Sequence, residues 1–136
     1  MRPELRPAIA TDVPAVLTLW RGVAAPTSTD NEAAVSALLF RDPGGLIVAD
    51  AGGRIVGSVI AGWDGWRGSV YRLAVAPSHR RHGLGVRLLR AAEDRLSALG
   101  AQRMHAIVIG TDPQAVGFWD ATDWEGQPGQ LRYTKG

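Results

Sequence analysis

The sequence contains no cysteine and only one lysine, Lys135, among its 136 residues. Without cysteine there can be no disulfide, no thiolate nucleophile and no cysteine-ligated metal. Long apolar runs are also missing, because no stretch approaches the roughly 20 residues needed to cross a bilayer. The first residues, Met1 to Arg6, lack the apolar segment of a secretion signal. These absences predict a chain of the cytoplasm that has no membrane anchor.

Positive charge in this chain comes almost entirely from arginine. The formal net charge is only +2, with 15 Lys and Arg residues against 13 Asp and Glu residues. A guanidinium binds phosphate and carboxylate through a planar fork of N–H donors. A general nucleic-acid binder would carry a larger positive excess along one face. We therefore expect a small phosphorylated ligand rather than a nucleic acid.

The length and composition are those of one globular domain. A chain of 136 residues is close to the commonest domain size, and 46% of its residues are hydrophobic, which is too many for a disordered chain. The sequence shows no internal repeat, low-complexity tract or linker. We therefore expect a single domain over residues 1–136.

The first part of the chain predicts one strand followed by two helices. The strand is expected over Glu4–Ile9, and Thr11 or Asp12 is suited to cap the first helix. That helix is expected to end near Gly22. The segment Thr29–Glu32 has the spacing of a capping box, which predicts that a second helix begins there.

The middle of the chain predicts three strands and a long amphipathic helix. Strand-like runs cover Leu46–Ala49, Ile55–Ala61 and Ser69–Val75, and glycine-rich turns separate them, which favours an antiparallel meander. A helix is expected from near Gly83 to Leu99, because apolar residues recur there every three or four positions.

The last part predicts a strand over Met104–Ile109, a short helix capped by Asp112, and a final hairpin over Trp124–Lys135. The expected order is therefore β-α-α-β-β-β-α-β-α-β-β. This order indicates the α/β class, with a mixed, largely antiparallel sheet and helices on both faces.

The segment Leu73–Val86 carries the clearest chemical signal. It runs from a strand through a basic turn into a helix, where unpaired backbone N–H groups meet the positive end of the helix dipole. Such groups bind phosphate, and Gly83 and Gly85 leave room for it to approach the backbone. The basic side chains of the turn, which add positive potential, are Arg80, Arg81 and His82.

Two common phosphate motifs do not match this segment. Val86 and Arg87 follow Gly85, where a Walker A loop has Lys and then Ser or Thr. Leu88 stands where a dinucleotide-binding fingerprint has its third glycine. Without further information, the alternative is an ordinary strand-to-helix turn that happens to use glycine.

The run Arg80–Gly85 resembles the Q/R-x-x-G-x-G/A signature of the GNAT superfamily of acyl-CoA-dependent N-acyltransferases. The preceding Leu73–Pro77 resembles the strand that leads into that signature, and the element order is similar along nearly the whole chain. The resemblance implies a GNAT-like fold. It also implies an N-acetyltransferase that moves an acetyl group from acetyl-CoA to a primary amine by direct attack.

The resemblance further implies which residues hold acetyl-CoA. Backbone N–H groups of Arg81 to Val86 would bind the pyrophosphate, and the main chain of Leu73 to Val75 would pair with the pantetheine arm like an added strand. Asp112 lies where the family often has an asparagine that contacts this arm. The residues assigned to the cofactor are Leu73, Ala74, Val75, Arg80, Arg81, His82, Gly83, Leu84, Gly85, Val86, Asp112 and Trp119.

The usual acid and base of the family are both replaced. Many members carry Glu on the strand before the signature, whereas Gly68–Val75 holds no carboxylate. Many carry Tyr in the helix after the next strand, whereas this chain has Trp119, whose indole donates a hydrogen bond but not a proton at working pH. The catalytic candidates that remain are Tyr71, Ser69 and Tyr133, with Asp120 as a further alternative.

Three interpretations of the chemistry therefore stay open. Solvent can carry the protons, because positioning alone supplies much of the rate. The polar candidates can carry them instead. Third, the chain can be a non-catalytic acyl-CoA-binding or regulatory module.

A nucleic-acid-binding domain on the basic helix Arg80–Arg95 is a further alternative, and it would bind with a steep salt dependence. Glu93, Asp94 and the small net charge argue against it.

The remaining expectations concern histidines and partners. The three histidines, His79, His82 and His105, lack a metal-ligand spacing, so no metal is expected. His105 is interpreted as a polar residue on the outer face of a strand, in preference to a catalytic one. By the same resemblance, the loop Ala24–Asp30 would line the acceptor side. The expected partners are acetyl-CoA and an amine, and a homodimer is a further expectation.

Overall fold

The computed structural model describes residues 2–136. Its helices and strands, in chain order, are β1 (Glu4–Pro7), α1 (Val13–Val23), α2 (Glu32–Arg41), β2 (Leu46–Ala51), β3 (Arg54–Trp63), β4 (Gly68–Val75), α3 (Leu84–Leu99), β5 (Met104–Ala106) and α4 (Pro113–Asp120). Short 3-10 turns at Ala10–Asp12 and Pro77–His79 come before α1 and α3.

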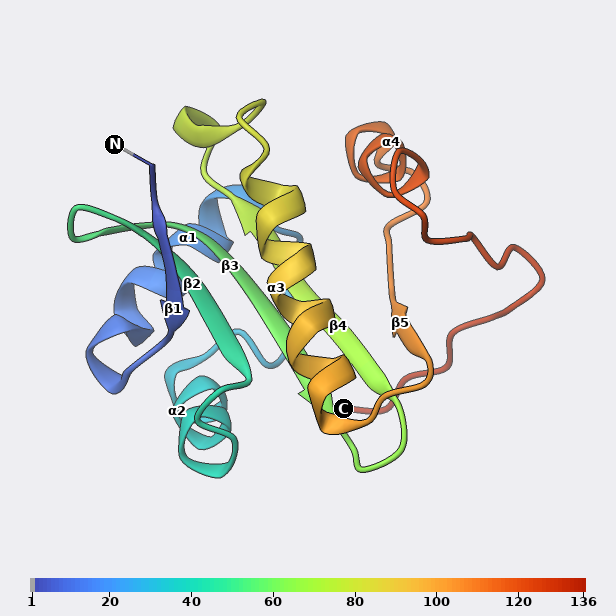
Figure 1. The fold of residues 1–136 in the computed structure, drawn as a ribbon, viewed down its shortest axis with the longest axis horizontal. Coiled ribbons are helices and arrows are strands. Elements are labelled where there is room, and N and C mark those ends of the chain that lie inside the picture. Colours follow the sequence, from blue (N-terminus) through green and yellow to red (C-terminus); the bar gives the residue numbers. More distant parts are fainter. Residues whose placement is uncertain (1) are drawn as a thin grey trace. The chain divides into compact units, whose positions relative to one another are not determined.

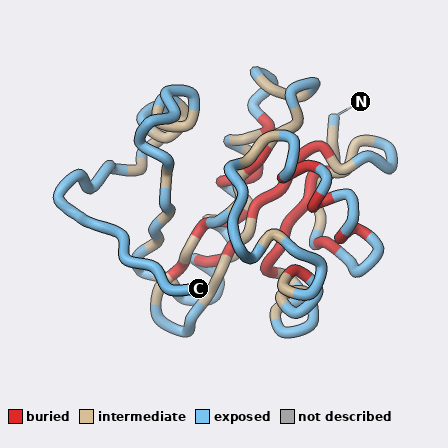
Figure 2. The backbone as a smooth tube through the Cα atoms, turned by 180° about the vertical axis from the view of Figure 1, so that it is seen from behind, coloured by how far each residue is buried: buried red, intermediate tan, exposed pale blue. Residues whose placement is uncertain are grey.

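The chain divides into two compact units, one ending at Ala106 and the other covering Ile107–Gly136. The first unit contains the sheet, α1, α2 and α3, and it holds every buried residue among those described, as Figure 2 shows. The second unit contains α4. The single domain expected over residues 1–136 stays a prediction.

The five strands form one sheet in the order β1-β2-β3-β4-β5. The first three pairings are antiparallel, and β4 pairs with β5 in parallel. The sequence prediction of an antiparallel meander over β2, β3 and β4 is therefore confirmed. The parallel pairing is possible because α3 carries the chain from the end of β4 back to the start of β5.

Helices cover both faces of the sheet, as expected from the sequence. A Cβ atom placed on Gly57 of β3 would lie 2.9 Å from a methyl carbon of Leu88 in α3. The next residue, Ser58, accepts a hydrogen bond of 2.8 Å from the indole of Trp20 in α1. Successive strand residues point to opposite faces, so α3 and α1 lie on opposite sides. In Figure 1, α3 crosses in front of β3 and β4.

The apolar periodicity seen in the sequence becomes the core. Trp20 of α1, Leu46 and Val48 of β2, and Val35 of α2 are buried together in one hydrophobic cluster. The buried stripe of α3 consists of Leu84, Leu88, Leu89, Ala92 and Leu96. Burial of a leucine side chain contributes about 1.5–3 kcal/mol, so these contacts fix the sheet between its two layers of helices.

α1 begins where the sequence predicts, with Asp12 at the N-cap position and Pro14 in the first turn, but the structure corrects the hydrogen bonding of Asp12 and the start of α2. The carboxylate of Asp12 does not cap α1, because it accepts from the N–H of Ile9 at 2.8 Å and from Arg6. The cap of α2 is Asn31, whose side-chain oxygen accepts from the N–H of Ala34 at 2.9 Å. The capping box predicted at Thr29–Glu32 is therefore wrong, because α2 begins two residues later than that spacing implies.

Two expectations for the end of the chain are also corrected. The strand expected over Met104–Ile109 is formed only over Met104–Ala106. The final hairpin over Trp124–Lys135 is absent, since residues 121–136 contain neither helix nor strand. A turn does form there, with the N–H of Gln130 donating to the carbonyl of Gln127 at 3.2 Å, but the apolar side chains beside it, Leu131 and Tyr133, stay exposed, so no burial supports a pair of strands.

Candidate active site

A bulge interrupts β4 where it pairs with β3. The register between the two strands shifts between Ser58 and Ile60, and Arg72 at the bulge has a φ of 51°, in the left-handed region. The hydroxyl of Ser58 donates to the carbonyl of Arg72 at 2.8 Å, while the same hydroxyl accepts from the indole N–H of Trp20 at 2.8 Å. A buried chain of two hydrogen bonds therefore holds the bulge in place.

The side chain of Arg72 connects the bulge to the loop between α1 and α2. Its guanidinium forms an ion pair with the carboxylate of Asp30, with Nε 3.0 Å from Oδ1, and it donates to the carbonyl of Ala25 at 2.9 Å. It also lies 5.4 Å from the ring centroid of Trp20. Sequence reasoning missed this role, because the partners are separated by more than 40 residues.

Beyond the bulge, β4 has one edge without a strand partner in the first unit. β5 pairs with β4 only over Gly68–Val70, so the pairing ends before Tyr71. The N–H of Ala76 donates to the carbonyl of Val56 in β3 at 2.8 Å. Since backbone groups alternate along a strand, those of Leu73 and Val75 point away from β3. No strand of the first unit pairs with this edge, which leaves it open to an extended ligand, and at its end the carbonyl of Val75 accepts from the Nε of Arg80 at 3.3 Å.

The turn after β4 presents a set of backbone donors. None of the N–H groups from residues 81 to 86 has a hydrogen-bond partner within residues 2–136. Arg81 has a φ of 65° and Gly83, the N-cap of α3, a φ of 77°. Among residues 2–136, Arg72 and Arg81 are the two non-glycine residues in the left-handed region. Strained backbone of this kind concentrates at ligand sites.

A pocket with basic side chains adjoins this turn. It is lined by Arg2, Pro3, Ser78, His79, His82, Leu84 and Arg87. The guanidinium of Arg87 donates to the carbonyl of Pro3 at 2.9 Å. Burial, with Arg2 nearby, lowers the pKa of Arg87 from its usual value. The positive charges are held next to the unpartnered N–H groups, an arrangement that suits an anion.

Polar side chains gather where β4 and β5 stop pairing. Ser69 lies opposite His105 in the register, and the Oγ of Ser69 is 3.0 Å from the Nε2 of His105. Tyr71, two residues after Ser69, shares its face of the sheet and is half exposed. A Cβ atom on Gly62 would lie 3.2 Å from the Tyr71 ring, so the missing side chain of Gly62 leaves room for that ring.

Three of the predicted site residues lie in the second unit. Asp112 caps α4, and its carboxylate accepts from the N–H groups of Gln114 and Ala115 at 3.1 and 3.2 Å. Trp119 packs edge-on against Trp124, with ring centroids 4.9 Å apart. Tyr133 is exposed in the segment without helix or strand. The hydrogen bonds that Asp112 accepts at the start of α4 confirm the short helix that the sequence predicts after this residue.

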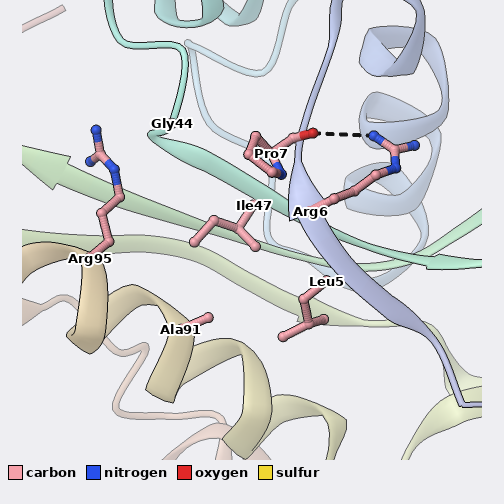
Figure 3. A pocket seen from close by; sticks show the side chains of 7 residues that line it. All are labelled: Leu5, Arg6, Pro7, Gly44, Ile47, Ala91 and Arg95. Carbon is pink, nitrogen blue, oxygen red and sulfur yellow. Dashed lines mark hydrogen bonds between the residues drawn. The ribbon is translucent and has the colours of Figure 1, made fainter.

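A second pocket lies between β1, β2 and α3 (Figure 3). Its lining residues are Leu5, Arg6, Pro7, Gly44, Ile47, Ala91 and Arg95. The two arginines are already partnered, Arg95 with Asp42 and with the carbonyl of Ala61, and Arg6 with Asp12. The pocket therefore presents no free polar group for chemistry.

Metal and membrane signals are absent from the part of the chain that the structure describes. No three His, Cys, Asp or Glu side chains among residues 2–136 are grouped so that they could hold a metal ion. Likewise, none of the helices in that range combines the length and the apolar character needed to cross a membrane.

Known proteins resemble this chain over most of its length. An acetyltransferase of Pectobacterium atrosepticum is 35% identical over 124 residues, which cover 90% of this chain and 87% of that protein. An acetyltransferase of Sodalis glossinidius is 31% identical over 130 residues, covering 94% of this chain and 91% of that protein.

Solved structures share the fold at lower identity. The aminoglycoside N-acetyltransferase AAC(6')-Iy, in complex with the bisubstrate analogue CoA-S-monomethyl-acetylneamine, has a TM-score of 0.79 at 17% identity and covers 100% of this chain and 99% of its own. Ard1 of Thermoplasma volcanium has a TM-score of 0.77 at 17% identity, over 88% of this chain and 80% of its own. The family model for GNAT acetyltransferases matches residues 15–122. This match covers most of the chain, and the signature turn and the bulged sheet agree with it. The chain therefore belongs to the acetyltransferase (GNAT) family.

Proposed function

We propose that this chain transfers the acetyl group of acetyl-CoA to a primary amine, by direct attack of the neutral amine on the thioester carbonyl. One observation carries the proposal. Backbone groups without a backbone partner run from the open edge of β4 at Leu73 and Val75 to the N–H groups of residues 81–86, and the carbonyl of Val75 accepts a side-chain hydrogen bond of 3.3 Å from the Nε of Arg80. An elongated ligand with amides at one end and phosphates at the other matches this series of donors and acceptors.

The open edge of β4 fits the pantetheine arm. Amides of the arm would pair with the outward-pointing backbone of Leu73 and Val75, as an added strand pairs with a sheet edge. Ala74 directs its backbone groups toward β3, so it would hold the flanking residues at strand spacing. The bulge at Arg72 marks the end of this run, and the reacting thioester would lie near it.

The turn and the basic pocket fit the phosphates. The N–H groups of residues 81–86 would bind the pyrophosphate at the positive end of the α3 dipole. Arg80, Arg81 and His82 contribute positive potential, and Arg2 and Arg87 add charge in the adjoining pocket. The backbone conformation at Gly83 is one that few side chains tolerate, so this position suits a close approach of ligand to main chain.

Within the first unit, the polar residues nearest the end of the β4–β5 pairing would act on the amine. Ser69 and Tyr71 present hydroxyls on the face opposite α3, and they are the proposed catalytic residues of that unit. Tyr133 is a third candidate, while Asp112 and Trp119 stay proposed contacts of the ligand. Bound acetyl-CoA supplies the activated acetyl thioester, and the chain supplies position and proton transfer.

A non-catalytic acyl-CoA-binding module is the second candidate. It is favoured by the missing carboxylate on Gly68–Val75, where the family resemblance leads one to expect a general base. Both candidates require acetyl-CoA to bind at the same turn. Only the enzyme releases CoA thiol in the presence of an amine, so turnover separates them.

The first test compares acetyl-CoA binding by the parent with that of two variants, Gly83→Trp and Gly52→Trp. Both glycines have positive φ, 77° and 63°, and neither has a neighbour within 4 Å of an added Cβ. The backbone strain of the two changes is therefore similar, and only Gly83 lies at the proposed site. A ligand present at a hundredfold excess over its Kd stabilises the native state by about 2.7 kcal/mol.

We expect acetyl-CoA to raise the melting temperature of the parent and of Gly52→Trp but not of Gly83→Trp. Turnover is then measured as release of free thiol with L-glutamate, spermidine, neamine and a hexapeptide with a free N-terminus. The chain has no cysteine, so any thiol detected is CoA. Binding without turnover on every amine supports the non-catalytic module, and no binding of any acyl-CoA rejects both candidates.

A further inference from the structure

The hydrogen bond between Ser69 and His105 joins two residues that the chain brings together across the parallel β4–β5 pair. The Ser69 Oγ and the His105 Nε2 are 3.0 Å apart, a normal hydrogen-bond distance. They are direct partners in the register, so the backbone pairing of the two strands fixes their approach. The His105 ring is exposed, whereas Ser69 is partly buried. The pair is therefore accessible to a substrate.

The position of this pair on the sheet matches the reacting end of the proposed site. Gly68 faces α3, because a Cβ on it would lie 2.7 Å from a methyl carbon of Leu96. Ser69 therefore faces the opposite side, as do its partner His105 and the next residue of that face, Tyr71. The β4–β5 pairing ends at Val70 and Ala106, so Ser69 stands two residues before Tyr71, the first residue of β4 without a partner in β5.

Within the first unit, the acidic residue Asp64 interacts electrostatically with His105. Asp64, in the turn between β3 and β4, accepts hydrogen bonds of 2.7 Å from the N–H groups of Arg67 and Trp66. These bonds hold the pKa of the Asp64 carboxyl below its usual range, and the nearby His105 ring contributes in the same direction. The carboxylate of Asp64 is thus held as an anion that interacts electrostatically with the imidazole of His105.

We infer that the Ser69 hydroxyl relays a proton from the ammonium group of the acceptor to the Nε2 of His105. The inference rests on the proposed acetyl transfer and names the proton acceptor that the missing glutamate leaves unassigned. Ser69 would contact the substrate directly. His105 would act through Ser69, and Asp64 would stabilise the imidazolium that results.

The ammonium gives one proton to the Ser69 oxygen while that hydroxyl passes its own proton to His105. The neutral amine attacks the thioester carbon, so a C–N bond forms and the C–S bond breaks with its electron pair on sulfur. The second amine proton goes to the thiolate, which leaves as CoA thiol. His105 then releases its proton to solvent, and the products are the amide, CoA thiol and one proton.

The test measures kcat/KM against pH for the parent, His105→Gln and Ser69→Ala, with Arg103→Gln as the matched control. Arg103 is exposed and directly precedes β5, so its change alters charge next to that strand without touching the relay. The amine is the one of the four named above with the highest rate. Acetyl-CoA binding is followed by thermal stability in every variant.

We expect His105→Gln to lose about 10²–10⁴-fold in kcat/KM near neutral pH, the contribution typical of general base catalysis. The loss should shrink as pH rises, because more of the amine is then already neutral. Ser69→Ala should show the same trend, and the double variant should lose little more than either single one. Acetyl-CoA should stabilise all variants as it stabilises the parent.

Three results would overturn the relay. One is a His105→Gln rate within twofold of the parent at neutral pH, and another is a loss that is the same at every pH. The third is an acetyl group on Ser69 in the intact mass, which would make Ser69 a nucleophile. These results differ from the one expected if the proposed acetyl transfer itself is wrong. In that case the parent protein releases no thiol with any amine.

Discussion

The carboxylate of Asp30 and the guanidinium of Arg72 form an ion pair that joins the loop between α1 and α2 to the bulge of β4. Both side chains are about 15% exposed. The pair therefore links the strand proposed to hold acetyl-CoA with the loop proposed to face the acceptor. A contact of this kind makes the position of one substrate depend on the segment that receives the other.

Arg72→Lys and Asp30→Asn test this link. Each change removes hydrogen bonds to a charged group, which are worth about 1.5–3 kcal/mol. We expect both to lower the free energy of unfolding by about 1–3 kcal/mol in urea titrations. Lysine should not rescue, because it lacks the fork that reaches Asp30, Ala25 and Thr27 together. Arg21→Gln, at an exposed position of α1, should change stability by less than about 0.5 kcal/mol.

Ser58→Ala tests the hydrogen-bond chain under the bulge. The change leaves the indole N–H of Trp20 and the carbonyl of Arg72 without the partner that the structure shows. A buried polar group left unsatisfied costs about 1–3 kcal/mol. We expect thermal unfolding to show a loss in this range or above it. Ser36→Ala, at an exposed position of α2, serves as the control, and an equal loss there would refute the role of Ser58.

Gly68→Ala tests the packing of α3 on β4. The added Cβ would lie 2.7 Å from a methyl carbon of Leu96, which is fully buried. Overpacking of this kind costs about 1–3 kcal/mol. Leu96→Val removes the clashing methyl groups but leaves a gap. We therefore expect the double variant to be less destabilised than the sum of the two single changes, as measured by urea unfolding.

Asp12 predicts an acid-dependent loss of stability. Hydrogen bonding to Arg6 is the main cause that lowers the pKa of Asp12 below its usual value of 3.8, and the N–H of Ile9 adds to it. A carboxyl with a depressed pKa in the folded state contributes stability above its unfolded pKa. That contribution is lost as pH falls through the folded pKa. We expect the stability difference between the parent and Asp12→Asn to shrink below about pH 4. A constant difference down to pH 2 would contradict this.

The regular part of the fold could be predicted from the sequence because its signals are local. The stripe of α3 and the glycine-rich turns of the meander are periodic patterns in short windows, and the structure confirms both. The final hairpin, expected over Trp124–Lys135 around Gln127–Gly129, is wrong, because a turn was its main local signal. That turn forms, but the alternating side chains Leu131 and Tyr133 beside it are exposed, so no packing supports the two strands.

The candidate site could be predicted only in part. The phosphate turn is contiguous in sequence, so its glycines and arginines could be recognised together. Arg72 and Asp30 are 42 residues apart, and Ser69 and His105 are 36 apart. Neither pairing has a local signal, because a bulge creates the first and the parallel register of β4 and β5 creates the second.

The open edge of β4 has a consequence for how the protein behaves at high concentration. An unpaired strand edge is a template on which another chain can add a strand, and such edges promote self-association. If acetyl-CoA pairs with Leu73 and Val75, it also masks this edge. Light scattering of concentrated samples should therefore fall when CoA is present, and the ligand would act as an inhibitor of aggregation as well as a substrate.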